Sequence, residues 1–469
     1  MRVPRPSPRS PDAADRSVAA PAPSRRDRHL RLPGRDFLSL RRDALGFFTR
    51  IHEERGDQAW FRVPGRRLVL LGHPDHARDI LLTHASKVEK GPALRSTRVL
   101  LGDGLLTSEG AVHLEHRRRL QPAFHRDELL RYVPGMVRQA GACADALRTG
   151  ETIDLTRILM QLTLGIVAEA LFGADLTAEA SRIGDALTEA LGAFRSLSLP
   201  LGGLLLALPL PRTRRFKAAR AELEAAVASL VARHGGRGHD DLLGTLLEAR
   251  EAGVFDDRAV RDEVMTLLLA GHETTALALT WSFHLLATHP GVEQALHAEL
   301  DRVLAGRLPT AEDLEALPVT RGVVGESLRL FPPAWVIGRR VLEPLPLTDG
   351  TVLPTGTIAV LCPWVLHRDA RFWPDPERVD PGRWTAEARA SRHRHAFIGF
   401  GAGTRACIGE GFAWNEGMLV LATLAARWRF VPVQTGPVVP EPGVTLRPRG
   451  GLPVHVEPRG PTAAQPPSA

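Results

Sequence analysis

Cysteine is scarce in this chain, and long apolar runs are absent. Three cysteines occur among 469 residues, Cys143, Cys362 and Cys407, which are too few for a disulfide framework and are typical of a reducing compartment. No stretch reaches the roughly 18 consecutive apolar residues of a membrane span, so we expect no membrane anchor. Internal repeats are missing as well, which argues against solenoids and propellers.

The positive charge is concentrated at one end of the chain. The net charge is +7, but residues 1–35 carry nine arginines against three aspartates, so the rest of the chain is nearly neutral. This tail is rich in Pro, Ala and Ser and has no hydrophobic periodicity, so we expect it to be disordered. We expect no nucleic-acid partner, because the body carries no basic excess, and no export, because Arg25-Arg26 is followed by charge rather than an apolar run.

Hydrophobic periodicity organises the rest of the chain. Residues 60–72 predict two short strands around a Pro-Gly turn. Helical spacing dominates from about 114 to 290, including a helix over 257–289, and another helix is predicted over 410–427. A second β-rich stretch runs from 335 to 361. The pattern predicts a mainly α protein with small accessory β-sheets.

Cys407 stands in a glycine-rich loop that leads into the helix predicted over 410–427. Glycines in this loop allow a tight turn beside a flat cofactor. Arg405 and the positive end of the following helix are expected to ionise the Cys407 thiol, and a thiolate can hold iron. Without a cofactor, the same loop would simply bury a cysteine. The spacing Phe-x-x-Gly-x-Arg-x-Cys-x-Gly resembles the haem-binding signature of the cytochrome P450 family, matched at Phe400, Gly403, Arg405, Cys407 and Gly409.

The resemblance covers residues from about 35 to 455. It implies the mostly helical P450 fold as a single catalytic domain over 36–455, between a disordered tail at 1–35 and a second disordered tail at 456–469. It also implies haem b as the cofactor, with Cys407 as the iron ligand. His113 and Arg117, four residues apart on one helix face, are expected to bind one haem propionate, and Arg339 the other. Taken alone, the basic helix around His113 would equally suit a solvated face or nucleic acid.

Glu326 and Arg329 lie three residues apart on a predicted helix that Pro332-Pro333 ends. Taken alone, this spacing suits an exposed ion pair. Pro381-Gly-Arg383-Trp384 lies between this helix and Cys407, and it resembles the family's Pro-Glu-Arg-Phe segment with Gly382 in place of glutamate. The resemblance implies a buried, structural cluster of Glu326, Arg329 and Arg383.

Glu273 and Thr274 interrupt an apolar helix in the string Ala270-Gly-His-Glu-Thr-Thr275, where a charge and hydroxyls cost desolvation. The string resembles the family's oxygen-activation motif, which implies that Glu273 and Thr274 deliver protons for dioxygen reduction. His272 remains without a predicted role. We expect an apolar substrate pocket lined by Ala270, Gly271, Thr275, Ala334, Val336 and Ile337. The leucine-rich stretch 190–215 either contributes to this pocket or packs in the core.

The predicted activity is insertion of one atom of O2 into an apolar small molecule of terpenoid, fatty acyl or polyketide type. The chain ends 62 residues after Cys407, so we expect no bound flavin and electrons from a ferredoxin or flavodoxin with its NAD(P)H reductase. Arg118 and Arg119 are expected to dock this partner. We expect a cytoplasmic monomer. A peroxide-dependent peroxygenase, an isomerase and a non-catalytic haem-binding protein are the alternatives, and the Glu273 and Thr274 pair argues against them.

Overall fold

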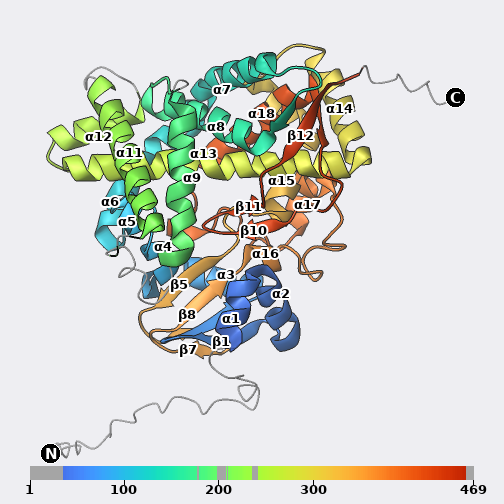
Figure 1. Ribbon diagram of the computed structural model, residues 1–469. Coiled ribbons are helices and arrows are strands. Elements are labelled where there is room, and N and C mark those ends of the chain that lie inside the picture. The colour runs from blue at the N-terminus through green and yellow to red at the C-terminus, as the bar shows by residue number, and fades with distance from the viewer. Residues whose placement is uncertain (1–34, 177–178, 198–207, 209, 235–240, 461–469) are drawn as a thin grey trace, which may run out of the picture.

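The computed structural model describes residues 35–176, 179–197, 208, 210–234 and 241–460. Its two parts are a large helical region and a smaller β-rich region (Figure 1). The predicted mainly α protein with small separate sheets is confirmed. The tail predicted at 1–35 lies almost wholly outside the described residues, as do Leu201, Leu204, Leu205 and Leu206 of the leucine-rich stretch.

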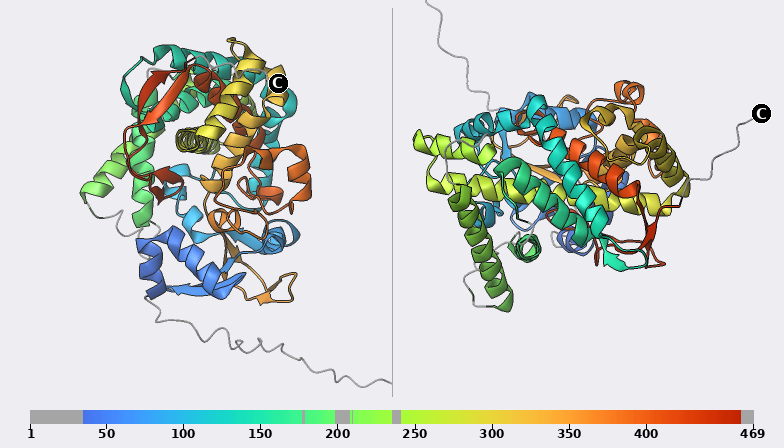
Figure 2. Two further views of the ribbon diagram at one scale, coloured as in Figure 1. Left: turned by 90° about the vertical axis from the view of Figure 1, so that its right-hand side faces the viewer. Right: turned by 90° about the horizontal axis from the view of Figure 1, so that it is seen from above.

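The central element is α13 (Asp257–Thr288), which crosses the helical region (Figure 1) and is seen nearly end on in the left view of Figure 2. It begins where the Asp256 side chain accepts a hydrogen bond from the Ala259 amide at 2.7 Å, an ordinary N-cap. The helices α7 (Arg126–Ala146), α8 (Leu155–Phe172), α15 (Pro318–Leu330) and α18 (Glu410–Ala425) pack around it in one apolar core. The remaining long helices are α6 (Gly110–Leu120), α9 (Ala180–Leu197), α11 (Pro211–His234), α12 (Leu242–Glu251) and α14 (Pro290–Leu304).

Close contact between α8 and α13 depends on a glycine. A Cβ on Gly271 would lie 2.5 Å from Val167 Cγ2 of α8, so a larger residue could not be accommodated without separating the helices. By length and composition alone α8 could cross a membrane. Its buried residues, however, belong to the same core as those of α13, which is how a core helix of a globular protein is built.

The β-rich region is a five-stranded sheet in the order β1-β2-β8-β5-β3. The predicted hairpin is confirmed as β1 (Gln58–Val63) and β2 (Arg66–Leu71), and the predicted later stretch supplies β5 (Ile337–Val341) and β8 (Ile358–Leu361). The edge strand β3 (Val88–Lys90) pairs with β5. The helices α1 (Arg35–Arg42) and α2 (Ala44–Arg55) lie next to this sheet (Figure 1). Short elements complete this half of the chain: α3 (Pro74–Arg78), α4 (Pro92–Arg95), α5 (Arg98–Leu101), β6 (Leu345–Pro346), β7 (Val352–Leu353), α16 (Pro363–Leu366) and α17 (Ala386–Ser391).

The last strands correct one predicted boundary. A three-stranded sheet joins β4 (Thr152–Asp154), β12 (Pro453–Pro458) and β9 (Trp428–Pro432). Val456 is fully buried and pairs with Phe430, so the prediction that a disordered tail begins at 456 was wrong. The proline-rich composition of this segment suggests a frayed end, but the segment forms β12 and pairs with the edge of β9. A separate hairpin of β10 (Pro440–Pro442) and β11 (Leu446–Pro448) approaches α13.

Candidate active site

The loop around Cys407 is a tight turn before α18. The Cys407 amide donates to the Phe400 carbonyl at 2.8 Å, and the Ala406 amide donates to the Gly403 carbonyl at 3.0 Å. Gly403 has a φ of +69° and lies against the Leu81 carbonyl, so a Cβ would clash there. Arg117 on α6 donates to the Ala406 carbonyl at 2.8 Å. Backbone and Arg117 together fix the direction of the cysteine side chain.

Cys407 is not ionised by its neighbours alone, contrary to the prediction. Burial raises the pKa of the Cys407 thiol to about 11, and the backbone of Gly409 and the charge of Arg117 only partly oppose this. The Arg405 guanidinium does not supply the predicted charge, because it donates to the Ser108 carbonyl at 3.0 Å and to the Glu109 carboxylate. Cys407 as a whole residue is nevertheless exposed. A bound metal ion would itself deprotonate the thiol.

Five basic residues form a cluster beside this loop: Lys90, His113, Arg117, Arg339 and Arg405. Burial lowers the pKa of His113 to about 3, and the charges of Arg405, Lys90 and Arg117 lower it further. Burial and then Arg405 also lower the pKa of Arg339 to about 10. Charges act on one another in this way only at short range. The predicted residues His113, Arg117 and Arg339 therefore lie close to Arg405. We call these five residues the cation cluster.

Lys90 and Glu109 are members of this site that the sequence did not reveal. Burial lowers the pKa of Lys90 to about 7, and the charge of Arg405 lowers it further. Its ammonium donates to the carbonyls of Leu105 at 3.0 Å and Ser108 at 2.7 Å, while Glu109 accepts from the Lys90 amide at 2.6 Å. Nothing local marks Lys90, because only the pairing of β3 with β5 brings it beside Arg339.

The cation cluster has too few anions of its own. Within the described part of the chain, Glu109 and Glu263 are the carboxylates that oppose the pKa shift of Lys90. Buried charges persist when they are paired, so this cluster fits a ligand that carries two carboxylates. Haem carries two propionates. Cys407 is an exposed residue and lies next to the cluster, because Arg117 donates to the carbonyl of the preceding residue, Ala406. The residues therefore fit haem bound through both its iron and its propionates.

One narrow stripe of α13 is open. Between Asp262 and Leu286 every residue is buried except Ala270, Gly271, Thr274 and His284. Ala270 and Thr274 lie one turn apart, and the Thr274 hydroxyl donates to the Ala270 carbonyl at 2.7 Å. Gly271 lies against Val167 of α8, so we call Ala270 and Thr274 the open face of α13. His272 is buried, and its ring bonds to the Leu268 carbonyl at 2.7 Å within the helix, which gives it no role at this face.

Glu273 is held by the C-terminal hairpin. Its carboxylate accepts from Thr445 Oγ1 at 2.5 Å and from the Arg447 guanidinium at 2.6 and 2.8 Å. Glu273 is almost fully buried, whereas about a quarter of the Arg447 side chain, 27%, is exposed. Glu273 therefore lies next to Thr274 in sequence but is bound to strand β11. Thr445 and Arg447 carry no local signal in the sequence that would pair them with Glu273.

Glu326 and Arg329 form a buried pair on α15. Arg329 Nε and Nη2 donate to the two Glu326 oxygens at 2.8 and 2.7 Å, and both side chains are fully buried. Glu326 also accepts from Trp384 Nε1 and from the Asp380 amide, each at 3.0 Å. The predicted Arg383 also forms an ion pair with this carboxylate, but a weaker one, since its Nε lies 3.8 Å away and makes no hydrogen bond to it. Glu326, with Arg329, Trp384 and the Asp380 amide, is called the Glu326 cluster below.

His367 links the Glu326 cluster to the Cys407 loop. Its Nδ1 donates to the Arg329 carbonyl at 3.2 Å, and its Nε2 accepts from the Ile398 amide at 3.0 Å. Burial lowers the pKa of His367 to about 3, so the ring stays neutral and can accept this bond. The Ile398 carbonyl in turn accepts from the Gly401 amide at 2.9 Å. The cluster thus supports the loop from behind, in line with a structural role.

The predicted substrate-pocket residues are only partly brought together. Ala270 lies on the open face of α13, Gly271 packs against α8, and Ala334, Val336 and Ile337 are exposed or half-buried before and within β5. Thr275 is buried, and its hydroxyl donates to the Gly271 carbonyl at 3.2 Å, so its place in the pocket lining stays a prediction. A small apolar pocket lies nearby, lined by Ser96, Thr97, Val99, Leu100, Leu101, Ala190, Leu191, Phe216 and Leu269.

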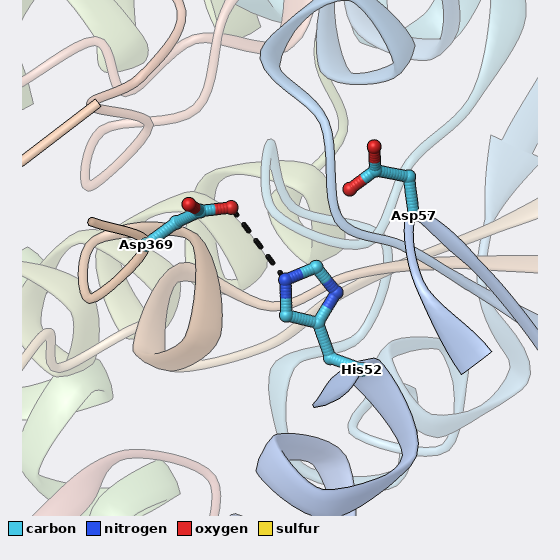
Figure 3. Close-up of side chains that lie close together, drawn as sticks. All are labelled: His52, Asp57 and Asp369. Carbon is cyan, nitrogen blue, oxygen red and sulfur yellow. Dashed lines mark ion pairs between the residues drawn. The ribbon is translucent and has the colours of Figure 1, made fainter. Parts of the chain in front are cut away.

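A group of possible metal ligands away from this site has another explanation. His52 points toward Asp369, at 3.5 Å, with Asp57 opposite (Figure 3). Arg371 donates to both carboxylates, with its Nη2 at 2.5 Å from each. The arginine already supplies the positive charge that a metal ion would bring, so we interpret this group as an ion-pair network.

Comparisons with known proteins agree with this geometry. The family model described as Cytochrome P450 matches residues 37–453. Cyclooctatin synthase from Streptomyces melanosporofaciens is 38% identical, with 90% of this chain and 93% of the relative covered. Cyclooctat-9-en-7-ol 5-monooxygenase from the same organism is also 38% identical, covering 90% and 92%. Pentalenene oxygenase from Streptomyces avermitilis is 35% identical, covering 84% and 86%.

Proposed function

Since this chain belongs to the cytochrome P450 family and is a haem-dependent monooxygenase that uses O2, we propose that its substrate is a terpenoid. The names of two relatives, pentalenene oxygenase and cyclooctat-9-en-7-ol 5-monooxygenase, carry this proposal. A small pocket between α5, α9, α11 and α13 has seven apolar residues among its nine lining residues, which agrees with an apolar substrate, although at about 10 Å³ the pocket would have to open to admit one. A compact hydrocarbon skeleton gains most of its affinity from such a lining.

We propose haem b as the cofactor, held at two ends. Cys407 would ligate the iron, and the cation cluster would bind the two propionates through His113, Arg117, Arg339, Arg405 and Lys90. Phe400, Gly403 and Gly409 would shape the loop around the ligand. When bound, haem supplies the activation of dioxygen that inserts one oxygen atom into the substrate. We expect no bound flavin in this chain.

Thr274 and Glu273 are proposed to serve proton delivery at the open face of α13. The Thr274 hydroxyl is partly exposed there and, by rotating away from the Ala270 carbonyl, could donate to an oxygen or a water molecule. Glu273 is ion-paired with Arg447, whose side chain is partly exposed at the surface. Glu273 would therefore connect solvent to the helix rather than lie at the reacting atoms.

The substrate class can be tested by spectral titration. Cyclic diterpene and sesquiterpene hydrocarbons, their mono-hydroxylated forms, fatty acids and macrolide precursors would each be added to the ferric protein. We expect the haem Soret band to shift with terpenoids at lower concentrations than with the other classes. Replacing Leu269 of the pocket by Asn should weaken the terpenoid response, because a buried amide would lack partners. Saturation by fatty acids alone would refute the terpenoid proposal.

The electron donor is a separate redox protein in this proposal, a ferredoxin or flavodoxin with its NAD(P)H reductase. Arg118 and Arg119 are exposed on α6, next to Arg117, which contacts the Cys407 loop. Reversing both charges should slow electron transfer, most strongly at low salt. Reversing the exposed Arg429 on β9 should have little effect. Equal rates in the two variants would argue against docking at α6. We propose in addition that the protein is a cytoplasmic monomer.

A further inference from the structure

Three tryptophans form a chain of ring contacts beside the Cys407 loop, and the roles above do not use them for chemistry. The ring centre of Trp414 on α18 lies 6.1 Å from that of Phe400 and 5.7 Å from that of Trp384. Trp384 in turn lies 6.2 Å from Trp373. Phe400 belongs to the loop itself, because its carbonyl accepts from the Cys407 amide at 2.8 Å. Rings at such separations are in contact, and an electron passes readily between indoles in contact.

Trp414 and Trp384 differ from four other tryptophans in the groups that their indole N–H bonds to. Trp384 Nε1 donates to the Glu326 carboxylate at 3.0 Å. The Trp414 indole is hydrogen-bonded to the Glu410 carboxyl group, and this bond opposes the rise in the pKa of Glu410 that burial causes. Backbone carbonyls are the acceptors for Trp281, Trp335, Trp373 and Trp428. A carboxylate stabilises an indole that has lost an electron, because it carries negative charge and can accept the N–H proton.

The positive charges near these rings favour electron loss from Trp384 over electron loss from Trp373. The guanidinium carbons of Arg392 and Arg329 lie 4.0 and 5.2 Å from the centre of the Trp373 ring. These two cations oppose any further positive charge on Trp373, whose N–H has only a carbonyl as its acceptor. Trp414 and Trp384 each lie near one guanidinium, at 5.3 and 5.2 Å, and each has a carboxyl group to offset it. An oxidising equivalent that enters the chain should therefore stay on Trp414 and Trp384.

We propose that Trp414 and Trp384 form an electron-donating path that discharges an oxidised haem when no substrate is oxidised. In each step Trp384 loses one electron, which passes through Trp414 to a haem oxidised by a peroxide, and the Trp384 Nε1 proton passes to Glu326. Trp414 is half-buried, so a soluble thiol can reach it and return the electron, and Glu326 then returns the proton to Trp384. Two such steps reduce one hydrogen peroxide to two waters with the electrons and protons of two thiols, which join in a disulfide. The inference rests on the proposed haem at Cys407.

The oxidised tryptophan can be detected by electron paramagnetic resonance. Haem-loaded protein without substrate would be mixed with hydrogen peroxide and frozen rapidly. We expect a tryptophan radical in the wild-type protein, its loss in the double variant Trp384→Phe with Trp414→Phe, and the wild-type signal in Trp373→Phe, from the same aromatic cluster. The double variant should fold, because phenylalanine stands at the place of Trp384 in the family's Pro-Glu-Arg-Phe segment.

Two results of this experiment would overturn the proposal. One is a wild-type protein whose haem reacts with peroxide but which gives no tryptophan radical. The other is a signal of wild-type size in the double variant. Failure of the haem assignment would be distinguishable, because the wild-type protein would then bind no haem through Cys407 and its absorption spectrum would show no reaction with peroxide.

The protective role can be separated from a packing effect by adding a thiol. Bleaching of the haem by excess hydrogen peroxide would be followed with and without glutathione. Glutathione should slow the bleaching of the wild-type protein and of Trp373→Phe, because the path transmits its electrons, and this protection should be lost in the double variant. A merely structural change would speed bleaching equally with and without the thiol. Equal protection by glutathione in the wild-type protein and the double variant, or loss of protection in Trp373→Phe as well, would overturn the proposal.

Discussion

Two buried clusters of charge, the Glu326 cluster and the cation cluster, differ in whether the chain completes them. Arg329 makes five hydrogen bonds, two to Glu326 and three to the carbonyls of His367, Pro376 and Arg378. Glu326 accepts four. In the cation cluster, by contrast, the charge of Arg405 lowers the pKa values of Lys90, His113 and Arg339. Among the described residues, Glu109 is the one carboxylate that bonds to two members, through the Lys90 amide and the Arg405 guanidinium.

The difference separates a structural cluster from a binding site. A buried group whose partners are all protein atoms contributes to the fold, and removing one partner leaves a charge stranded. A buried group whose partners are missing destabilises the fold until a ligand supplies them. The Glu326 cluster should therefore govern stability, and the cation cluster should govern haem affinity.

The largest effect is expected from breaking the complete cluster. Glu326→Ala should lower the free energy of unfolding by about 3–5 kcal/mol, because Arg329 would remain buried without its counter-charge. Denaturant unfolding of the apoprotein measures this loss. Glu343→Ala, at an exposed pair with Lys87, should stay within about 0.5 kcal/mol of wild type. A loss of similar size in both variants would contradict the comparison.

Removing a member of the cation cluster should weaken haem binding without destabilising the apoprotein. Arg339→Met should weaken haem binding by about 1.5–3 kcal/mol, the usual contribution of a hydrogen bond to a charged group. The apoprotein should be no less stable, because one of several mutually repelling charges is lost. Haem transfer to an acceptor protein measures the first quantity and denaturant unfolding the second. An unstable apoprotein with unchanged haem affinity would show that the cluster stabilises the fold and does not bind haem.

Haem binding should also depend on pH through Lys90. Its pKa of about 7 in the protein without ligand should rise when propionates bind nearby. Above pH 7 the apoprotein then carries a neutral Lys90 and the complex a charged one, so Lys90 takes up a proton on binding. The Cys407 thiol, with its pKa of about 11, loses a proton when it becomes the iron ligand. The two protons cancel above pH 7, where affinity should level off, and below pH 7 affinity should rise with pH by up to about tenfold per unit. Haem titration in buffers of different ionisation enthalpy counts the protons. Lys90→Met should bind more weakly and its affinity should keep rising above pH 7, and a wild-type pH dependence in this variant would contradict the assignment.

The smallest effect is expected at Arg383. Its Nε lies 3.8 Å from Glu326 and makes no hydrogen bond, although Nη2 donates to the Asp375 carbonyl at 3.0 Å. Arg383→Ala should lower the free energy of unfolding by about 1 kcal/mol, the usual contribution of one hydrogen bond. Denaturant unfolding of Arg383→Ala and Glu326→Ala, measured side by side, gives the ratio of the two losses in the free energy of unfolding. An equal loss in the two variants would show that Arg383 is a full member of the Glu326 cluster.

Local patterns in the sequence were sufficient for the Cys407 loop, the helix carrying Glu273 and Thr274, and the Glu326–Arg329 pair. Each is encoded within about ten neighbouring residues, so periodicity and spacing report it. Lys90, Glu109, Thr445 and Arg447 were missed because their partners are distant in sequence. The direction of the Arg405 side chain was also wrong. Two residues from Cys407 in sequence, it turns to Glu109 instead, and spacing alone does not determine side-chain direction.

The central claim is that Cys407 holds a haem iron as a thiolate, and the reduced carbon monoxide complex tests it most directly. Although the free thiol has a pKa of about 11, iron binding should deprotonate it at neutral pH. We expect the wild-type complex to show the long-wavelength Soret band characteristic of thiolate ligation, and Cys407→His to lose it while still binding haem through the cation cluster. A wild-type spectrum with the shorter-wavelength band of histidine-ligated or thiol-ligated haem would contradict the account.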